Sequence, residues 1–173
     1  MMKTIMDEAG VARTLKRIAH EIIEHHEDLE DVVLMGVIHR GDTLAHRLQR
    51  NIEILAGERV ECCSVDFRPW RDDLEGERPE KTAAPCDVRE KVVILCDDVL
   101  FRGRTVRAAM DGIMSFGRPR KIELMVLVDR GHRELPIRAD YVGKNVPTSL
   151  EEIVKVNLRE YDQEDSVVIE QAE

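Results

Sequence analysis

Two adjacent carboxylates followed by a glycine-containing turn are the part of the sequence best suited to chemistry. Asp97 and Asp98 follow the apolar run 92–95 after Cys96, and four spacer residues separate them from Gly103, which is two residues before Thr105. Ligands of open parallel sheets bind beyond the carboxyl ends of the strands, and the amino end of a helix offers unpaired amides and a favourable dipole to phosphate. The carboxylates can accept hydrogen bonds from vicinal ribose hydroxyls, directly or near Mg²⁺. The pattern therefore predicts a ribose 5-phosphate site.

The acidic pair taken alone has a second interpretation, in which it merely ends a strand and caps a loop. The complete segment is more specific, because it joins an apolar strand, two acids, four spacers and a glycine–threonine turn. Gly103 lets the backbone come close to a phosphate, and the Thr105 hydroxyl can donate to a phosphate oxygen. We therefore interpret residues 92–105 as a phosphate and ribose site.

Periodic apolar residues predict the elements that position this segment. Helical spacing occurs over 7–26, from 42 onward and over 105–116, and apolar runs of strand length occur at 31–38, 60–66, 91–97 and 122–128. Shorter strands are expected around 141–144 and 154–156. This alternation predicts an α/β fold with a mainly parallel central sheet and helices on both faces.

The length of 173 residues suits a single domain, 1–173, with one substantial core. Within it, the segment 67–90 holds Pro69, Gly76, Pro79 and Pro85 among many charges and has no clear period. A long insert of this kind in a compact domain is usually either functional or disordered.

The net charge of −9 argues against indiscriminate binding to nucleic acids. Most of that charge lies beyond Leu150, whereas bases outnumber acids between Gly117 and Lys144, so a locally basic face is expected. No apolar run approaches the ~20 residues needed to span a bilayer, and the amino-terminal residues form no apolar signal region. A cytoplasmic protein is the resulting expectation.

The four cysteines, Cys62, Cys63, Cys86 and Cys96, include no C-x-x-C pair, which argues against a zinc or redox site. Cys62 and Cys63 are adjacent, so on a strand they would point to opposite faces. Because disulfides are rare in the cytosol, all four are expected to be reduced thiols.

Residues 92–105 resemble the binding motif for phosphoribosyl pyrophosphate (PRPP) in the type I phosphoribosyltransferases. The likeness extends over nearly the whole chain to the PyrR family, through 17–21, 70–74, 103–109 and above all 127–149, a run that generic phosphoribosyltransferases lack. Members of that family act as uracil phosphoribosyltransferases and as RNA-binding attenuators of pyrimidine operons that respond to uridine nucleotides. The resemblance implies a type I phosphoribosyltransferase-like fold, with a flexible loop at about 67–90 and a small hood at about 129–149.

The resemblance also implies roles for individual residues. Arg40 and Gly41 match the family's pyrophosphate-binding loop, and Arg71 would be a pyrophosphate ligand that acts in catalysis with Asp97 and Asp98. The implied substrate site comprises His39, Arg40, Gly41, Asp97, Asp98, Val99, Leu100, Phe101, Arg102, Gly103, Arg104, Thr105, Asp129 and Arg130. PRPP, uracil, UMP and UTP are the implied ligands, and Mg²⁺, near the acidic pair, is the implied cofactor. The simpler alternative for Arg40 and Arg71 is a solvated arginine.

Four residues match positions implicated in RNA binding in the family, namely His20, Arg133, Arg138 and Lys144, and Lys16 occupies a further such position with a different residue type. Lysine and arginine neutralise phosphates, and arginine planes can contact exposed bases in single-stranded loops. Each residue taken singly is more simply a solvated side chain. As a set they imply that leader mRNA of a pyrimidine operon is a partner, and the family resemblance also suggests a homodimer or higher homo-oligomer. Lys16 stands where a hydroxyl residue is usual, which would alter base selectivity.

Three substrate-loop residues depart from the family pattern. Phe101 and Arg102 stand where tyrosine and threonine are usual, and His39 stands where threonine usually precedes Arg40. Arg102 would either pair with the 5-phosphate or fill its place. We hypothesise that the chain keeps nucleotide and RNA recognition but is a weak uracil phosphoribosyltransferase. Two rivals stay open: an RNA-binding nucleotide sensor without catalysis, and a phosphoribosyltransferase for another base.

Overall fold

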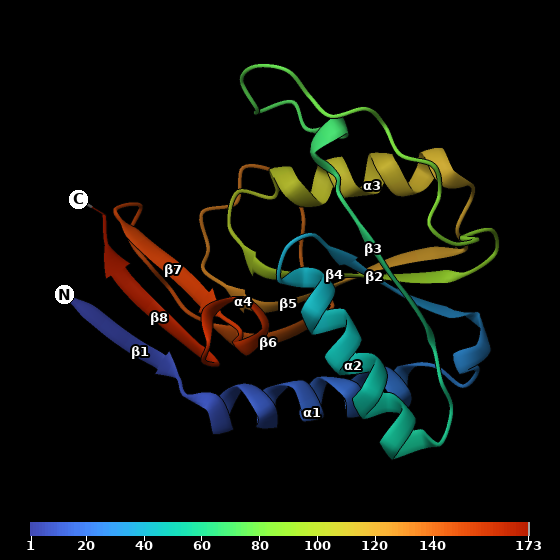
Figure 1. Cartoon of the computed structure of the whole chain (residues 1–173), viewed down its shortest axis with the longest axis horizontal. Helices are drawn as coiled ribbons and strands as arrows, with labels where there is room; N and C mark the ends of the chain where they lie inside the picture. The colour runs from blue at the N-terminus through green and yellow to red at the C-terminus, as the bar shows by residue number, and fades with distance from the viewer. Residues whose placement is uncertain (173) are drawn as a thin grey trace.

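A five-stranded parallel sheet lies at the centre of the computed structural model, which describes residues 1–172 (Figure 1). Its strands follow the spatial order β3 (Glu61–Val65), β2 (Val32–Val37), β4 (Val92–Leu100), β5 (Lys121–Asp129) and β6 (Tyr141–Asn145). Every residue of β2 is buried, and so are the first six residues of β4. Strands covered on both faces need apolar residues at successive positions, which explains the continuous apolar runs of the sequence.

Helices cover both faces of this sheet. Figure 1 shows α1 (Glu8–His25) and α2 (Gly41–Ala56) on one face and α3 (Arg104–Phe116) on the other. The neighbouring residues Val93 and Ile94 of β4 accordingly enter different cores, Ile94 under α1 and α2 and Val93 under α3. The predicted α/β fold with helices on both faces is therefore confirmed.

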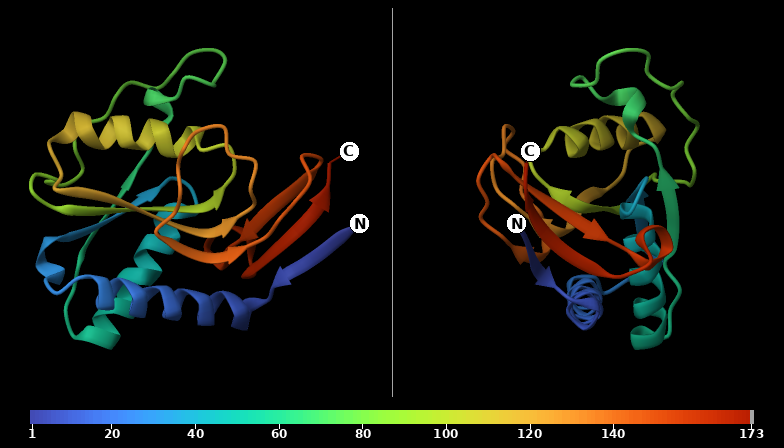
Figure 2. Two further views of the ribbon diagram at one scale, coloured as in Figure 1. Left: turned by 180° about the vertical axis from the view of Figure 1, so that it is seen from behind. Right: turned by 60° about the vertical axis from the view of Figure 1, so that its left-hand side comes forward.

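A second, antiparallel sheet stands beside the carboxyl end of β4. It contains β1 (Met2–Met6), β8 (Ser166–Gln171) and β7 (Glu152–Asn157), in that order, and Figure 2 shows the chain termini beside each other at its outer end. The short helix α4 (Arg159–Asp162) connects β7 to β8. Arg47 of α2 binds Glu160 and Asp165, which fastens this connection to the central domain.

The expected strands and helices all occur, with boundaries shifted by a few residues. β4 continues past its predicted end to Leu100, and α3 begins at Arg104. All of 67–90 is described, and within it only the 3-10 helix η2 (Arg68–Trp70) is regular; a second such turn, η1 (Leu29–Asp31), precedes β2. The segment 129–149 is divided, because 141–145 forms the edge strand of the central sheet while 130–140 crosses the start of α3. Of the described helices, none combines the length and apolarity required to cross a membrane.

A buried polar cluster closes the end of the sheet opposite the acidic pair. Glu123, near the start of β5, is 4% exposed, and its Oε1 lies 2.6 Å from His26 Nε2 and 3.0 Å from the Tyr141 hydroxyl. Lys121 Nζ lies 3.1 Å from Glu123 Oε2. Burial by itself raises the pKa of Glu123, but the hydrogen bonds from His26, Lys121 and Tyr141 outweigh it and lower the pKa below its ordinary value.

Glu123→Gln should destabilise the protein at neutral pH by about 1.5–3 kcal/mol, the range for hydrogen bonds to a charged group. A carboxyl whose pKa is lower in the folded state contributes stability above its unfolded pKa and loses it as the pH falls through the folded pKa. Urea unfolding of both proteins should therefore show a constant difference above roughly pH 5 that shrinks as the solution becomes more acidic. Glu53→Gln, at an exposed position of α2, is the control. A difference independent of pH would contradict this account.

Candidate functional site

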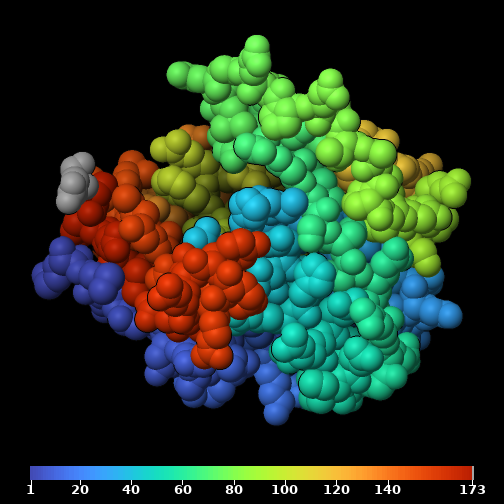
Figure 3. Space-filling model, in the orientation of Figure 1, coloured from blue at the N-terminus to red at the C-terminus, as the bar shows by residue number. Residues whose placement is uncertain are grey.

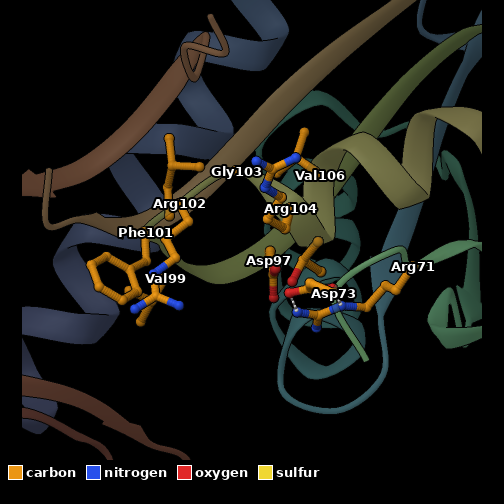
Figure 4. Close-up of a pocket in the computed structure, with 11 residues that line it drawn as sticks. Arg71, Asp73, Asp97, Val99, Phe101, Arg102, Gly103, Arg104 and Val106 are labelled. Atoms are coloured by element: carbon orange, nitrogen blue, oxygen red, sulfur yellow. Dashed lines mark hydrogen bonds and ion pairs between the residues drawn. The ribbon is translucent and has the colours of Figure 1, made fainter. Parts of the chain in front are cut away.

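A cavity of about 160 Å³ opens where β4 meets the turn into α3 (Figure 4). Its lining comes from the end of β4, the turn, the start of α3 and the 67–90 loop: Arg71, Asp73, Asp97, Val99, Leu100, Phe101, Arg102, Gly103, Arg104, Thr105 and Val106. The structure thus brings Arg71 to the same cavity as the 97–105 segment. Asp73 and Val106 also line it, although sequence reasoning assigned them no role.

Gly103 shapes the turn at the amino end of α3. Its φ of 91° lies in the left-handed region that favours glycine, and no described side chain caps the helix there. The first amides of α3 therefore remain available to an anion at the positive end of the helix dipole. The amide of Glu134 donates to the Arg102 carbonyl at 2.9 Å, which fastens the turn to the 130–140 segment.

The two carboxylates at the end of β4 are held by backbone amides. Asp97 Oδ1 accepts from the amide of Asp98 at 2.9 Å, and Asp98 Oδ1 accepts from the amide of Val99 at 2.8 Å. Burial raises the pKa of Asp97 well above its ordinary value and the charge of Asp98 raises it further, while Arg71 opposes both effects. Burial also raises the pKa of Asp98, against the charge of Arg40. Hydroxyl donors or a cation at this place would favour the ionised pair.

The acidic pair joins two cavities. Asp97 lines the cavity beside the turn, whereas Asp98 lines a neighbouring cavity of about 430 Å³ together with Arg40, Lys155 and Asp162. The second cavity lies between the central sheet and the second sheet, because β7 supplies one of its walls. A ligand that contacted both carboxylates would reach both cavities.

The loop between β2 and α2 packs tightly against the end of β4. A Cβ at Gly41 would lie 2.4 Å from the carbonyl oxygen of Cys96, so a side chain there would collide with the strand. Gly36 is equally confined, since its Cβ would lie 2.3 Å from the Cα of Asp42. Between them, the Ile38–His39 peptide bond is cis, and Arg40 has a φ of 75°. The loop backbone is therefore positioned directly beside the acidic pair.

The side chain of Arg40 is held by the connection between β7 and β8. Its Nη2 and Nε lie 2.8 and 3.2 Å from the carboxylate of Asp162, and its guanidinium carbon lies 5.6 Å from the centroid of the Tyr161 ring. The ring of His39 meets the same tyrosine edge-on, with 5.6 Å between centroids. Figure 3 shows the α4 segment lying over the amino end of α2. Sequence reasoning missed Asp162 and Tyr161, because they are distant from Arg40 in the sequence and no motif connects them to it.

Arg71 follows a firmly docked tryptophan. Trp70 is 8% exposed and meets Phe116 of α3 edge-on, with 5.8 Å between ring centroids. Arg71 Nε and Nη2 then donate to the carboxylate of Asp73 at 2.8 and 2.6 Å, as the dashed lines in Figure 4 mark. The start of the 67–90 loop is therefore fixed to α3, and it presents a cation to the cavity that contains Asp97.

Asp129 and Arg130 adjoin the turn without lining either cavity. The guanidinium carbon of Arg130 lies 3.9 Å from the centroid of the Phe101 ring, and that of Arg102 lies 4.9 Å from it. Arg130 Nε donates to Thr148 Oγ1 at 3.1 Å, which orients the stacked guanidinium. Burial lowers the pKa of Arg130, and the charge of Arg102 acts in the same direction. Asp129 Oδ1 accepts from the backbone amide that follows Arg130 at 3.0 Å.

The residues expected to contact RNA form two groups beside the edge strand β6. The first group comprises Lys16 and His20, which are exposed on α1, and Lys144, which is exposed on β6. Arg17 of α1 connects the two elements, because its guanidinium donates to the carbonyl of Gly143 in β6 at 2.7 Å. Arg133 and Arg138 are exposed in the 130–140 segment, and Arg138 borders a surface hollow with α3. Within the described part of the chain, no ion pair includes Lys16, Arg138 or Lys144, whereas Arg133 pairs with Asp129 at 3.7 Å.

Comparison with known proteins gives consistent results. Residues 1–162 match the family model described as phosphoribosyl transferase domain. The bifunctional protein PyrR of Clostridioides difficile (strain 630) is 52% identical over 171 residues, covering 96% of this chain and 97% of the relative. That of Caldicellulosiruptor saccharolyticus is 50% identical, covering 98% and 95%.

Solved structures share the fold at low identity. A hypoxanthine-guanine phosphoribosyltransferase from Bacillus anthracis has a TM-score of 0.76 at 20% identity, covering 99% of both chains. The hypoxanthine phosphoribosyltransferase of Trypanosoma cruzi has a TM-score of 0.75 at 17% identity, covering 99% of this chain and 97% of the other. The fold is therefore that of the type I phosphoribosyltransferases, and the chain belongs to the PyrR family within them.

Proposed function

We propose that this phosphoribosyltransferase converts uracil and PRPP to UMP and diphosphate, and that it also binds pyrimidine-operon leader mRNA in response to UMP or UTP. The observation that carries the catalytic part is the largely buried Asp97–Asp98 pair beside the uncapped amino end of α3. Together these groups suit a ribose that carries a 5-phosphate. Uracil as the base rests on membership of the PyrR family.

The proposed reaction breaks the C1–O bond of PRPP and forms a bond from C1 to a ring nitrogen of uracil, which loses its proton. The α3 amides and the Thr105 hydroxyl would hold the 5-phosphate, and the acidic pair would accept hydrogen bonds from the ribose hydroxyls. The charge of Arg71 acts on Asp97 and the charge of Arg40 acts on Asp98, so both arginines are suited to the leaving diphosphate. Most of the rate enhancement would then come from positioning and charge stabilisation.

The donor set also suits Mg²⁺, a cation that prefers oxygen ligands and usually binds through one or two carboxylates together with substrate phosphates. Asp97 and Asp98 are the residues that would hold it. The described residues contain no cluster of three or more metal-ligating side chains, so PRPP and water would complete the coordination. Bound Mg²⁺ would neutralise charge on the diphosphate.

Asp97→Asn and Asp98→Asn should each weaken binding of PRPP or UMP by roughly 1.5–3 kcal/mol, because charge-assisted hydrogen bonds to ribose or the cation are lost. Titration calorimetry with each nucleotide measures this change directly. Glu53→Gln changes charge equally, far from the cavity, and should bind like the wild type. Unchanged affinity in both aspartate variants would remove the site assignment.

Arg102 is the departure from the family with the greatest expected effect on rate. Its side chain lines the cavity beside the α3 amides and lies 4.9 Å from the Phe101 ring. Displacement of reacting atoms by ~1 Å can cost a hundredfold in rate, so a long side chain in this turn is expected to impair catalysis. The proposed enzyme is accordingly a slow one.

Arg102→Thr, alone or with Phe101→Tyr and His39→Thr, should raise kcat/KM for UMP formation by about tenfold or more, or ~1.4 kcal/mol of transition-state stabilisation. Steady-state rates at one Mg²⁺ concentration test this. Arg118→Thr, at an exposed position outside the cavity, is the charge-matched control. Wild-type activity equal to or above that of the restored variants would identify Arg102 as a working phosphate ligand instead.

RNA binding is the second proposed function, supported by the exposed cations of α1, β6 and the 130–140 segment. Lys16, Arg138 and Lys144 have no ion-pair partner in the described structure, so pairing with RNA phosphates would not break an existing ion pair. If the protein formed no nucleotide from PRPP and any base, it would be a nucleotide-sensing RNA-binding protein without catalysis. If it used other bases but not uracil, it would be a phosphoribosyltransferase for another base.

Arg138→Ala or Lys144→Ala should weaken binding to a pyrimidine-leader RNA and flatten its dependence on salt by about one unit for each phosphate that the variant no longer neutralises. UMP binding should persist in both variants, since neither side chain lines the cavity. Filter binding over a series of salt concentrations provides the slopes, with Arg118→Ala as control. If the wild type does not prefer leader RNA over a scrambled hairpin, the regulatory proposal fails.

A further inference from the structure

Two cysteines meet where the 67–90 loop returns to the central sheet. Cys63 lies in β3, the edge strand, and Cys86 lies near the end of the loop; both are half-buried, and their Sγ atoms are 3.0 Å apart. Both side chains pack against the core under α3, and Val88, just beyond, is completely buried. Since a disulfide bond is about 2.05 Å long, the sulfur atoms need to approach by only ~1 Å.

The two thiols of this pair differ in acidity. The hydrogen bond with Cys63 lowers the pKa of Cys86, against burial and the nearby charges of Glu61 and Asp87. The same contact raises the pKa of Cys63, and burial adds to the rise. Cys86 is therefore the thiol that ionises first, and the thiolate is the reactive form of cysteine.

The other two cysteines lack this arrangement. Cys62 packs against the core under α1 and α2, on the opposite face of β3 from Cys63, and burial raises its pKa to about 12. Cys96 is fully buried in β4, and burial raises its pKa well above the ordinary value. Cys62 is therefore a control of identical chemistry, one residue away from Cys63.

We propose that Cys63 and Cys86 form a reversible disulfide that ties the returning end of the 67–90 loop to β3. The Cys86 thiolate attacks a low-molecular-weight disulfide, displaces one small thiolate and forms a mixed disulfide. Cys63 then loses its proton and attacks the Cys86 sulfur, which expels the protein-bound thiolate group as a second small thiolate. In sum, two protein thiols are oxidised and one small disulfide is reduced to two thiols. Excess small thiol reverses both steps.

The cross-link would give the loop a covalent anchor at its second end. Trp70 already fixes the beginning of the loop to α3, and the disulfide would fix its end to β3, with Arg71 in the segment between. A covalent closure reduces the conformations open to such a segment. In cytosolic proteins a disulfide of this kind is usually transient and responds to the redox state. This inference requires neither uracil chemistry nor RNA binding.

The test is to treat the reduced full-length protein with 2-hydroxyethyl disulfide, a neutral reagent that Glu61 and Asp87 do not repel. Thiol titration should show the loss of one pair of thiols per chain. Peptide mass mapping should show a disulfide between the peptide that contains Cys62 and Cys63 and the peptide that contains Cys86. Cys62→Ser should cross-link as fast as the wild type, whereas Cys63→Ser and Cys86→Ser should form no internal link. Equal cross-linking in Cys63→Ser, or mixed disulfides on both thiols without an internal link, would overturn the proposal.

A second measurement uses the wild-type chain alone and so avoids any folding defect of a variant. Lys81 is exposed in the loop and is followed by Thr82, so limited trypsin digestion should cut between Cys63 and Cys86 at this bond. After oxidation the two fragments should stay joined on a non-reducing gel and separate when dithiothreitol is added. Fragments that separate equally with and without prior oxidation would also overturn the proposal.

Discussion

Burial of two adjacent carboxylates at the end of the central strand is the constraint on which the functional site depends. β4 lies between β2 and β5, so its carboxyl end is enclosed on both sides; Asp97 is buried there and Asp98 is partly buried. Burial disfavours their charged forms, and their proximity adds repulsion. The surrounding structure compensates with backbone amides on the carboxylate oxygens and with Arg71 and Arg40 on opposite sides. A ligand that carries hydroxyl groups or a cation would stabilise the charged carboxylates further.

Tight backbone contacts keep these compensating groups in place. The loop that bears Arg40 approaches β4 so closely that Gly41 has no room for a Cβ, and the turn at Gly103 is hydrogen-bonded to the 130–140 segment. Arg40 is also paired with Asp162, which belongs to the connection between two strands of the second sheet. A movement of that sheet would therefore change the position of a cation beside Asp98. Arg40 therefore links the second sheet directly to the acidic pair, in addition to the contacts that Arg47 of α2 makes with Glu160 and Asp165.

Local patterns predicted the central sheet well, because strands buried on both faces and helices buried on one carry strong periodic signals. They also predicted the turn at 103–105, whose composition fits a backbone that must approach a phosphate. Of the second sheet only β7 was expected, as a short strand around 154–156. β1 and β8 were missed because they pair with each other although almost the whole sequence separates them, and because the short, mostly exposed β1 leaves little apolar signal. The same reason hid Asp162, Tyr161 and the Cys63–Cys86 contact, since each depends on residues that are distant in sequence. The cysteine spacing alone had argued against a redox role, because it contains no C-x-x-C pair.

Because aromatic residues are scarce in this chain, the fluorescence of its tryptophan can report on the 67–90 loop. The chain contains one tryptophan, and it lies at the point where the 67–90 loop leaves α3, directly before Arg71. Its ring contacts Phe116 and Phe67 and lies 5.8 Å from the ammonium group of Lys81, a residue from the far part of the same loop. Its fluorescence therefore comes from a single place, whose polarity changes when the loop changes its packing. The protein carries an intrinsic optical reporter of loop position, and no dye or added label is needed to read it.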